Sequence, residues 1–247
     1  MSYSFRDRDL EHAIAAMVDL HVAACELWQD HVETGDLSRD ARRRWRLTVP
    51  ADYFQAIRAA FDRAHIELTA YNLNVRDDFS DEEMQRGFEM AGWLGVPTIT
   101  ASANQHVVPR VARFAERFRI RAGMHNHSYI DPDEFATPDD LARALAISPW
   151  IAANLDIGHF TAANFDATAF LTAHHDRIVS LHLKDRKRND GPNVPWGQGD
   201  TPIKAVLRLL RDNRWPIPAN VEYEHDGTDT VAEVGACLRY CDEALTS

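Results

Sequence analysis

The sequence has few cysteines, no long apolar run and no excess of positive charge, and each deficit excludes a class of protein. Its 247 residues include three cysteines, at Cys25, Cys237 and Cys241, too few for a disulfide framework. No stretch approaches the roughly 20 consecutive apolar residues that a membrane span needs. The formal net charge of −11 argues against a nucleic-acid partner, because phosphate backbones are bound by clustered lysine and arginine.

These deficits, together with the lack of a signal peptide, predict a cytoplasmic protein with structural thiols. One dense basic run, RDARRRWR at 39–46, is too local to reverse the acidic balance, and we expect it in a solvated loop that faces a partner. A glycine-rich phosphate cradle is also missing, since WGQGD at 196–200 is too short to form one.

What the sequence does contain is an alternation of short apolar runs and amphipathic segments from end to end. The apolar runs predict strands at 21–28, 65–73, 96–102, 120–127, 150–158, 177–185 and 216–224. The segments between them predict helices at 8–19, 51–63, 80–95, 105–118, 137–147, 203–212 and 229–244. Strands that alternate with helices this often argue for a parallel sheet.

The predicted fold class is therefore α/β, a single-domain (β/α)8 TIM barrel that spans residues 1–247. Seven strands are clear, and closure of the barrel needs an eighth. Only Ser2–Phe5 is available for it, ahead of the first helix, so we expect a first strand that is short or truncated. The longest irregular pieces, 29–50 and 186–202, follow strands, on the side of a barrel where active-site loops lie.

Four of the predicted strands end with residues that bind metal. The motifs are GMHNHS at 123–128, ANLDIGH at 153–159, SLHLKD at 180–185 and ANVEYEHD at 219–226. Because side chains alternate along a strand, the polar set points into the barrel from all four strands; it comprises His125, Asp156, His182 and Glu222. Charged groups inside a barrel are unstable unless they are paired or bound to metal. The alternative interpretation is a set of satisfied core histidines and salt-bridged carboxylates.

The mixed oxygen and nitrogen ligands of this set suit Mn²⁺, Co²⁺, Mg²⁺ or Zn²⁺. Such a cation would act as a Lewis acid on a substrate's carbonyl and hydroxyl oxygens, and residues of this kind could support proton abstraction next to a carbonyl. Glu222 or a neighbouring histidine would be the base, and Lys184 or His159 would handle the developing charge or the returned proton. Return of the proton to carbon gives isomerisation or epimerisation, whereas departure of a β-hydroxyl gives dehydration.

In their order and spacing, these motifs resemble the xylose isomerase-like TIM-barrel superfamily, in its sugar phosphate isomerase/epimerase branch. The resemblance runs nearly end to end, through SYSFRDRDLEHAI (2–14), ELWQDH (26–31), FEMAGWLGV (88–96), HNH, LDIGH, HLKD, WGQGD and VEYEHD. It implies a metal-dependent enzyme of carbohydrate metabolism that acts on a small sugar, polyol or keto-sugar. It also implies that Asp156, His182 and Glu222 are metal ligands, with His125 where many members have a glutamate.

The histidine at position 125 bears on the choice between an epimerase and a lyase. In the epimerases that the sequence resembles, two glutamates exchange protons on opposite faces of one carbon, and replacement of one by His125 favours a lyase slightly. The first hypothesis remains an isomerase or epimerase. The second is a lyase of the inosose-dehydratase or keto-glycoside-eliminating type. The third is a non-catalytic sugar-binding barrel, which the loss of several ligands would support.

The resemblance also implies contacts with the substrate. Glu26 and His31 match its ELW…H pattern and are expected to bind sugar hydroxyls, with an ordinary strand-end salt bridge as the alternative. Lys184, His127 and His159 stand beside the predicted ligands and are assigned to the same pocket. The expected partner is a small sugar or polyol, and pairing into a homodimer is compatible with the resemblance.

Overall fold

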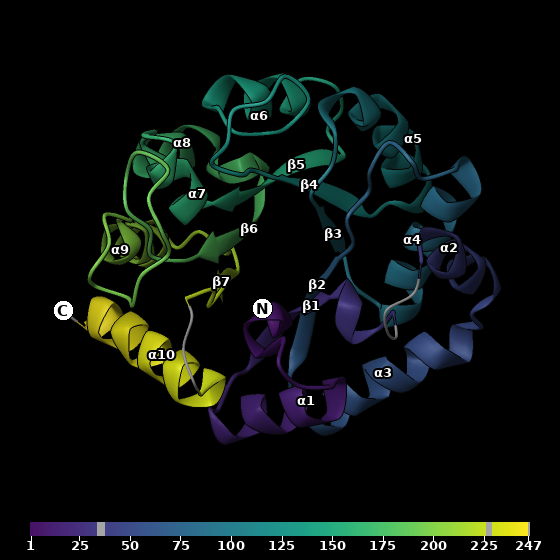
Figure 1. Cartoon of the computed structure of the whole chain (residues 1–247), viewed down its shortest axis with the longest axis horizontal. Helices are drawn as coiled ribbons and strands as arrows, with labels where there is room; N and C mark the ends of the chain where they lie inside the picture. The colour runs from purple at the N-terminus through teal and green to yellow at the C-terminus, as the bar shows by residue number, and fades with distance from the viewer. Residues whose placement is uncertain (34–37, 226–228, 247) are drawn as a thin grey trace.

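The strands of the protein lie side by side in sequence order around a common centre. A computed structural model describes residues 1–33, 38–225 and 229–246. Its seven parallel strands form one sheet, β1 to β7 in order, with helices outside it (Figure 1). The strands are β1 Ala24–Trp28, β2 Glu67–Asn72, β3 Thr98–Ala101, β4 Arg121–His125, β5 Ile151–Asp156, β6 Ile178–Leu183 and β7 Ala219–Val221. The predicted α/β barrel is confirmed, in the form of a nearly closed seven-stranded barrel.

The helices follow the amphipathic segments and obey their capping signals. In α4, Ser80 and Glu83 form the expected capping box, and Gly95 ends the helix with φ 69°. The expected segments correspond to α1 Leu10–Asp19, α3 Ala51–Arg63, α4 Asp81–Leu94, α5 Val108–Phe118, α6 Pro138–Leu145, α9 Ile203–Asn213 and α10 Thr230–Thr246. Helices that the sequence reading missed are α2 Arg39–Thr48, α7 Ile157–Ala162 and α8 Ala167–His174. Short 3-10 turns are η1 Ser2–Phe5, η2 Gln29–His31, η3 Gln105–Val107 and η4 His175–Arg177.

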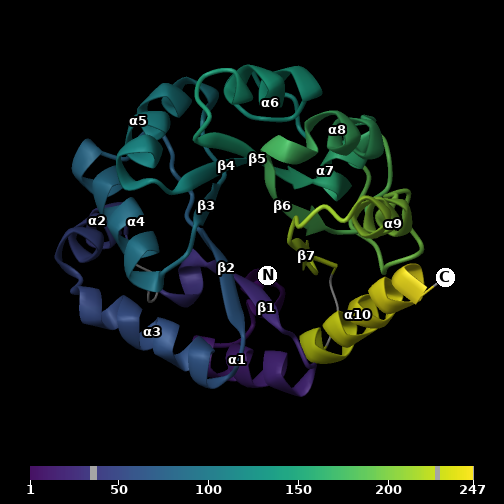
Figure 2. The same cartoon turned by 180° about the vertical axis from the view of Figure 1, so that it is seen from behind.

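The expectation of a first strand at Ser2–Phe5 is wrong, because this segment forms the 3-10 turn η1. The turn nevertheless lies between β7 and β1, where the ring of strands is open in both views (Figures 1 and 2). Ser4 Oγ donates to the Val221 carbonyl at 2.9 Å and accepts from the Tyr223 amide at 2.9 Å. On the other side, Ser2 Oγ accepts from the Trp28 amide at 2.8 Å. Serine hydroxyls thus satisfy the edge groups that a strand's main chain would otherwise pair.

The basic run at 39–46 is also not a solvated loop, since it forms most of helix α2. Arg46 is buried and donates to both carboxylate oxygens of Glu33 at 2.7 Å. Arg39 makes the same two-pronged contact with Glu83, at 2.7 and 2.8 Å. We expected this run to face a separate partner, but in the described part of the chain Arg39 and Arg46 pair with carboxylates of the chain itself. Two-pronged pairing of this kind is the geometry that guanidinium groups favour.

No helix in the described part of the chain is both long and apolar enough to cross a membrane.

We expect Arg46→Met to lower the free energy of unfolding by about 3–5 kcal/mol, because the buried Glu33 carboxylate loses its two hydrogen bonds to Arg46 and keeps the longer contact with Arg42 Nη1 at 3.6 Å. Urea denaturation monitored by circular dichroism measures the change. The matched control is Arg44→Met on the exposed side of the same helix, for which a change within about 0.5 kcal/mol is expected. Equal effects of the two substitutions would show that the buried pair does not hold α2 in place.

Candidate active site

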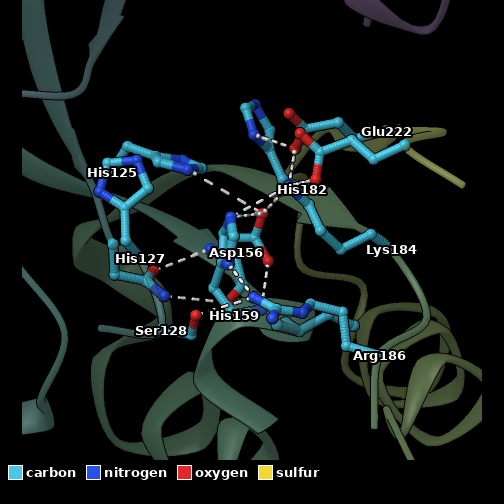
Figure 3. A network of polar contacts seen from close by, with 12 residues as sticks. His125, His127, Ser128, Asp156, His159, His182, Lys184, Arg186 and Glu222 are labelled. Atoms are coloured by element: carbon cyan, nitrogen blue, oxygen red, sulfur yellow. Dashed lines mark hydrogen bonds and ion pairs between the residues drawn. The ribbon is translucent and has the colours of Figure 1, made fainter. Parts of the chain in front are cut away.

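The four predicted ligands lie together at the carboxyl ends of the strands. His125 and Asp156 are the last residues of β4 and β5, His182 is next to last in β6, and Glu222 directly follows β7. Asp156 and His182 are register partners on neighbouring strands. Figure 3 shows their side chains directed toward one another. This is the end of the barrel at which side chains from several strands can reach one bound molecule.

A cavity of about 320 Å³ opens above these side chains. Its lining is mostly polar, as expected of a site for a small hydrophilic molecule. Its walls come from the N-terminal turn and from residues at or after the ends of several strands. The described residues that line it are Met1, Tyr3, Trp28, Asn72, Asn74, Ser102, His125, His127, His159, His182, Lys184, Glu222 and Glu224.

Asp156, His182 and Glu222 form the tightest group of metal-binding side chains. Each offers a ligand atom within 4.8 Å of the other two, and all three residues are buried. Asp156 Oδ2, His182 Nδ1 and Glu222 Oε2 make no hydrogen bond of ordinary geometry, although His182 Nδ1 and Glu222 Oε2 are only 2.8 Å apart. Buried polar atoms are rarely left this way. Orphaned oxygen and nitrogen atoms that converge on one point fit a divalent cation.

Lys184 supplies the positive charge that balances this group. Its ammonium lies 3.0 Å from Asp156 Oδ2, 3.1 Å from Glu222 Oε2 and 2.7 Å from Glu224 Oε2. Burial opposes the charge of Lys184, but these carboxylates outweigh burial and raise its pKa. Burial likewise raises the pKa of Asp156 to about 7, against the lowering effect of Lys184. A cation bound here therefore competes with Lys184 for two of its three carboxylates.

Glu222 stays ionised in this setting. Burial alone would raise the pKa of its carboxyl group, but Lys184 and His182 reverse the effect and hold that pKa well below its usual range. A carboxylate kept charged in a buried site is available both as a ligand and as a proton acceptor.

The imidazole of His182 is held from below by Glu26. Glu26 Oε1 accepts from His182 Nε2 at 2.8 Å, so the other ring nitrogen, Nδ1, faces Glu222. Burial disfavours the charged imidazole, but Glu26 and Glu222 raise the pKa of His182 to about 10. Thr100 Oγ1 and Ser180 Oγ donate to the same carboxylate, at 2.6 and 2.8 Å. A metal ion can replace the Nδ1 proton while Glu26 keeps Nε2–H, an arrangement common in metal sites.

The structure does not place Glu26 and His31 where the sequence reading expected them. Glu26 is buried beneath the cavity and is absent from its described lining, so its contacts favour a role in holding His182. His31 Nε2 lies 3.3 and 3.2 Å from the carbonyl oxygens of Phe5 and Arg8, also outside the lining. Sugar contacts by these two residues stay predictions without geometric support. Tyr3 and Trp28, which the motif reading passed over, line the cavity instead.

His125 lies near the ligand group but less tightly. Its Nε2 is 4.0 Å from Asp156 Oδ2, and it forms a second candidate group with Asp156 and His159. Its Nδ1 is 3.3 Å from the side-chain amide of Asn154. Burial and the neighbouring His182 lower the pKa of His125 well below its usual value. A neutral imidazole is the form that binds metal or accepts a proton, and its role as fourth ligand stays a prediction.

His127 lies on the same side of the cavity. Its Nε2 is 3.4 Å from Ser102 Oγ, and its Nδ1 is 3.4 Å from Glu134 Oε2. Burial lowers the pKa of His127, while Glu134 works in the opposite direction. The side chain is therefore a neutral polar group facing the cavity, consistent with the predicted contact to substrate.

His159 enters the cavity from helix α7 and directly follows Gly158, which lies against Lys184. Asp156 caps this helix, accepting from the His159 amide at 2.7 Å. A β-carbon at Gly158 would lie 2.3 Å from Lys184 Cγ and 2.6 Å from the Lys184 carbonyl oxygen. The glycine of the LDIGH motif thus permits β6 and α7 to approach, and it brings His159 Nε2 to 3.2 Å from Lys184 Nζ.

Comparison with known families agrees with this geometry. A family profile described as "Xylose isomerase-like TIM barrel" matches residues 29–241. Among curated proteins, the L-ribulose-5-phosphate 3-epimerase UlaE of Shigella flexneri is 30% identical over 96 residues, which cover 38% of this chain and 33% of that protein. The chain thus aligns with about a third of the length of this relative.

Solved structures share the fold over nearly the whole chain. The IOLI protein with a bound zinc atom superposes with a TM-score of 0.74 at 15% identity, covering 99% of this chain and 96% of that one. D-psicose 3-epimerase in the presence of D-fructose superposes with a TM-score of 0.73 at 12% identity, covering 97% and 95%. At these identities the likeness shows the fold. Within the chain itself, the buried cluster of Asp156, His182 and Glu222 is suited to hold a divalent metal.

We expect Glu26→Leu to weaken Mn²⁺ binding by about 10- to 100-fold, because His182 then loses the acceptor that orients it. Isothermal titration calorimetry on the full chain measures the affinity. Glu26→Gln keeps one acceptor oxygen and should fall between this variant and the parent. Glu67→Gln, exposed on neighbouring β2, is the control and should leave the affinity unchanged. Unchanged binding in Glu26→Leu would contradict the positioning role.

Removal of the competing cation should act in the opposite direction. We expect Lys184→Met to tighten Mn²⁺ binding at least about tenfold, because a positive charge 3.0–3.1 Å from Asp156 and Glu222 is lost. The same variant should melt at a lower temperature without metal, since three carboxylates lose their shared partner. Lys187→Met, an exposed neighbour, serves as control. Weaker Mn²⁺ binding by Lys184→Met would show that the cation binds elsewhere.

Proposed function

The chain belongs to the xylose isomerase-like TIM barrel family, and from this premise we propose that it is a divalent-metal-dependent isomerase or epimerase. Its substrate is a small sugar, polyol or keto-sugar, and the reaction moves a proton at the carbon next to a carbonyl. One observation carries the proposal: ligand atoms of Asp156, His182 and Glu222 lie within 4.8 Å of one another without hydrogen bonds of ordinary geometry, and His182 and Glu222 line the polar cavity. The zinc-bound relative and the epimerases of similar fold support it.

The residues present fit a divalent cation. Asp156, His182 and Glu222 would hold it, with His125 as the proposed fourth ligand; Mn²⁺, Co²⁺, Mg²⁺ and Zn²⁺ all suit such a set. When bound, the cation supplies Lewis-acid polarisation of the substrate's oxygens. Lys184 retains Glu224, at 2.7 Å, as a partner for its charge.

The chain's own groups divide the proton chemistry between them. Glu222 is ionised and lines the cavity, so we assign the abstraction of the proton to its carboxylate. Lys184 and His159 lie 3.2 Å apart at the cavity wall and are placed to face negative charge that develops on a substrate oxygen. Asn72, Asn74 and Ser102 supply neutral hydrogen-bonding groups for hydroxyls. Contacts of Glu26 and His31 with sugar hydroxyls stay predictions, and the hydrogen bond between Glu26 and His182 supports a positioning role for Glu26.

A lyase is the second candidate, and the distribution of carboxylates favours it. Among the described residues that line the cavity, the carboxylates are Glu222 and Glu224, both from the end of β7. The β4 side contributes His125 and His127 instead. A histidine opposite Glu222 that takes a proton from solvent can pass it, as imidazolium, to a departing β-hydroxyl, which then leaves as water; this is the step that distinguishes dehydration from epimerisation. A non-catalytic sugar-binding barrel remains the third candidate.

Exchange of substrate hydrogen with solvent tests the proposal. The Mn²⁺-loaded protein is incubated in D2O with D-fructose, D-psicose, L-ribulose 5-phosphate and an inosose, and recovered sugars are analysed by mass spectrometry. We expect deuterium at the carbon next to the carbonyl of one sugar, and Glu222→Gln should slow its incorporation about 10²- to 10⁴-fold. Glu67→Gln on the outer surface is the control.

The same incubations separate the candidates. An ultraviolet absorbance of a conjugated enone without deuterated starting sugar indicates the lyase. Saturable binding of a sugar without deuterium exchange or enone indicates a binding barrel and overturns both enzymatic readings.

A further inference from the structure

His159 lies between two positively charged side chains, which constrains where its proton can be. Its Nδ1 is 2.6 Å from Arg186 Nη1, and its Nε2 is 3.2 Å from Lys184 Nζ. Figure 3 shows Arg186 reaching His159 from the side away from Glu222. A guanidinium group carries hydrogen on every nitrogen, has no acceptor and does not lose its proton in proteins. His159 Nδ1 must therefore be the acceptor in this contact.

This contact fixes the state of the imidazole. With its lone pair on Nδ1 engaged, the ring is neutral and its hydrogen is on Nε2. The Lys184 ammonium is also a donor without a lone pair, but carboxylate oxygens of Asp156, Glu222 and Glu224 at 3.0, 3.1 and 2.7 Å accept its three hydrogens, so none is directed at Nε2. The Nε2–H group faces the cavity, and Asp156 Oδ2 is 4.0 Å away. A buried N–H group without a close acceptor in the described surroundings is suited to an oxygen of a bound molecule.

Arg186 itself is held too firmly to enter the cavity. The residue Arg186 is 9% exposed, and it is absent from the described lining of the cavity. The guanidinium donates to Ser128 Oγ at 2.8 Å and to the Gly191 carbonyl at 2.7 and 3.1 Å, and it pairs with Asp190 at 3.4 Å. Its backbone amide donates to Thr201 Oγ1 at 3.0 Å. Because these contacts hold Arg186 outside the described lining of the cavity, Arg186 can affect a bound molecule through its contact with His159.

We propose that Arg186 is a positioning residue that holds His159 as the Nε2–H tautomer, so that His159 donates a hydrogen bond to a substrate oxygen. The inference rests on the proposed function for the identity of that oxygen, a carbonyl or hydroxyl of the sugar. The inference also limits the role of His159 in the site. His159 is a donor rather than a base or a metal ligand, because both of those roles need the Nε2 lone pair that this tautomer lacks.

Nitrogen-15 NMR of the full chain labelled at histidine tests the tautomer directly. Long-range proton–nitrogen correlations distinguish Nε2–H, Nδ1–H and imidazolium rings, and His159→Gln identifies the resonance by its disappearance. Spectra are recorded without metal and with Mg²⁺, which is diamagnetic. We expect the Nε2–H pattern in the parent protein and in Arg188→Met, an exposed neighbour on the same loop. Arg186→Met should shift the ring away from this single tautomer, and Arg186→Lys, which keeps a donor, should restore it in part.

An Nδ1–H or imidazolium ring in the parent protein overturns the proposal, as does an unchanged tautomer in folded Arg186→Met. The parent spectrum decides the question even where Arg186→Met fails to fold. On a sugar that shows deuterium exchange, Arg186→Met and His159→Gln should each lower kcat/KM about 10- to 100-fold, and the double variant should lose no more than the larger single loss. Additive losses contradict a shared role. Absence of exchange with every sugar defeats the proposed function alone, because the tautomer is read without turnover.

Discussion

At the carboxyl end of the barrel, the Lys184 ammonium lies 2.7–3.1 Å from carboxylate oxygens of Asp156, Glu222 and Glu224. Beside it, His182 lies between Glu26 and Glu222. Ionised groups removed from water are stable only when charges of the other sign and hydrogen bonds surround them. The barrel therefore tolerates this concentration of charge because the cations at the end of β6, His182 and Lys184, lie among carboxylates from β1, β5 and the end of β7. A divalent cation would take the place of Lys184 against Asp156 and Glu222 and the place of the proton on His182 Nδ1.

The groups in the cavity wall that can carry a proton differ from one side of the cavity to the other. The carboxylates gather at the end of β7, whereas the neutral histidines His125 and His127 come from the β4 side. An enzyme with one carboxylate side and one imidazole side has two unlike proton carriers. That asymmetry suits a reaction that takes a proton on one face and delivers one elsewhere. It accounts for why epimerisation and dehydration both remain compatible with one site.

Much of this arrangement could be predicted from strand periodicity. Alternation along four strands places His125, Asp156, His182 and Glu222 on the inner face, and the structure brings the last three within ligand distance of one another. Periodicity does not report depth along the barrel, and the ELW…H resemblance that implies a sugar contact for Glu26 does not show that this side chain is buried outside the described lining of the cavity. Depth depends on the register between strands, and register arises from packing across the sheet.

Other features depend on contacts between distant parts of the chain, which local patterns do not contain. The arginines of the run at 39–46 pair with Glu33 and Glu83, carboxylates outside the run, so the run itself does not reveal that Arg46 is buried. Closure by η1 depends on serine hydroxyls that bond to β1 and to the end of β7. Arg186 carried no motif signal of its own beyond its place after HLKD, and its role emerges only from its contact with His159.

The central claim is that Asp156, His182 and Glu222 form one cation site that Lys184 balances when no cation is bound. A crystal structure of the protein grown with Mn²⁺, with anomalous diffraction data collected at the manganese edge, tests it most directly. The account predicts one strong anomalous peak bounded by these three side chains, with Lys184 paired to Glu224. An absent peak at saturating Mn²⁺, with Lys184 still against Asp156 and Glu222, would contradict it.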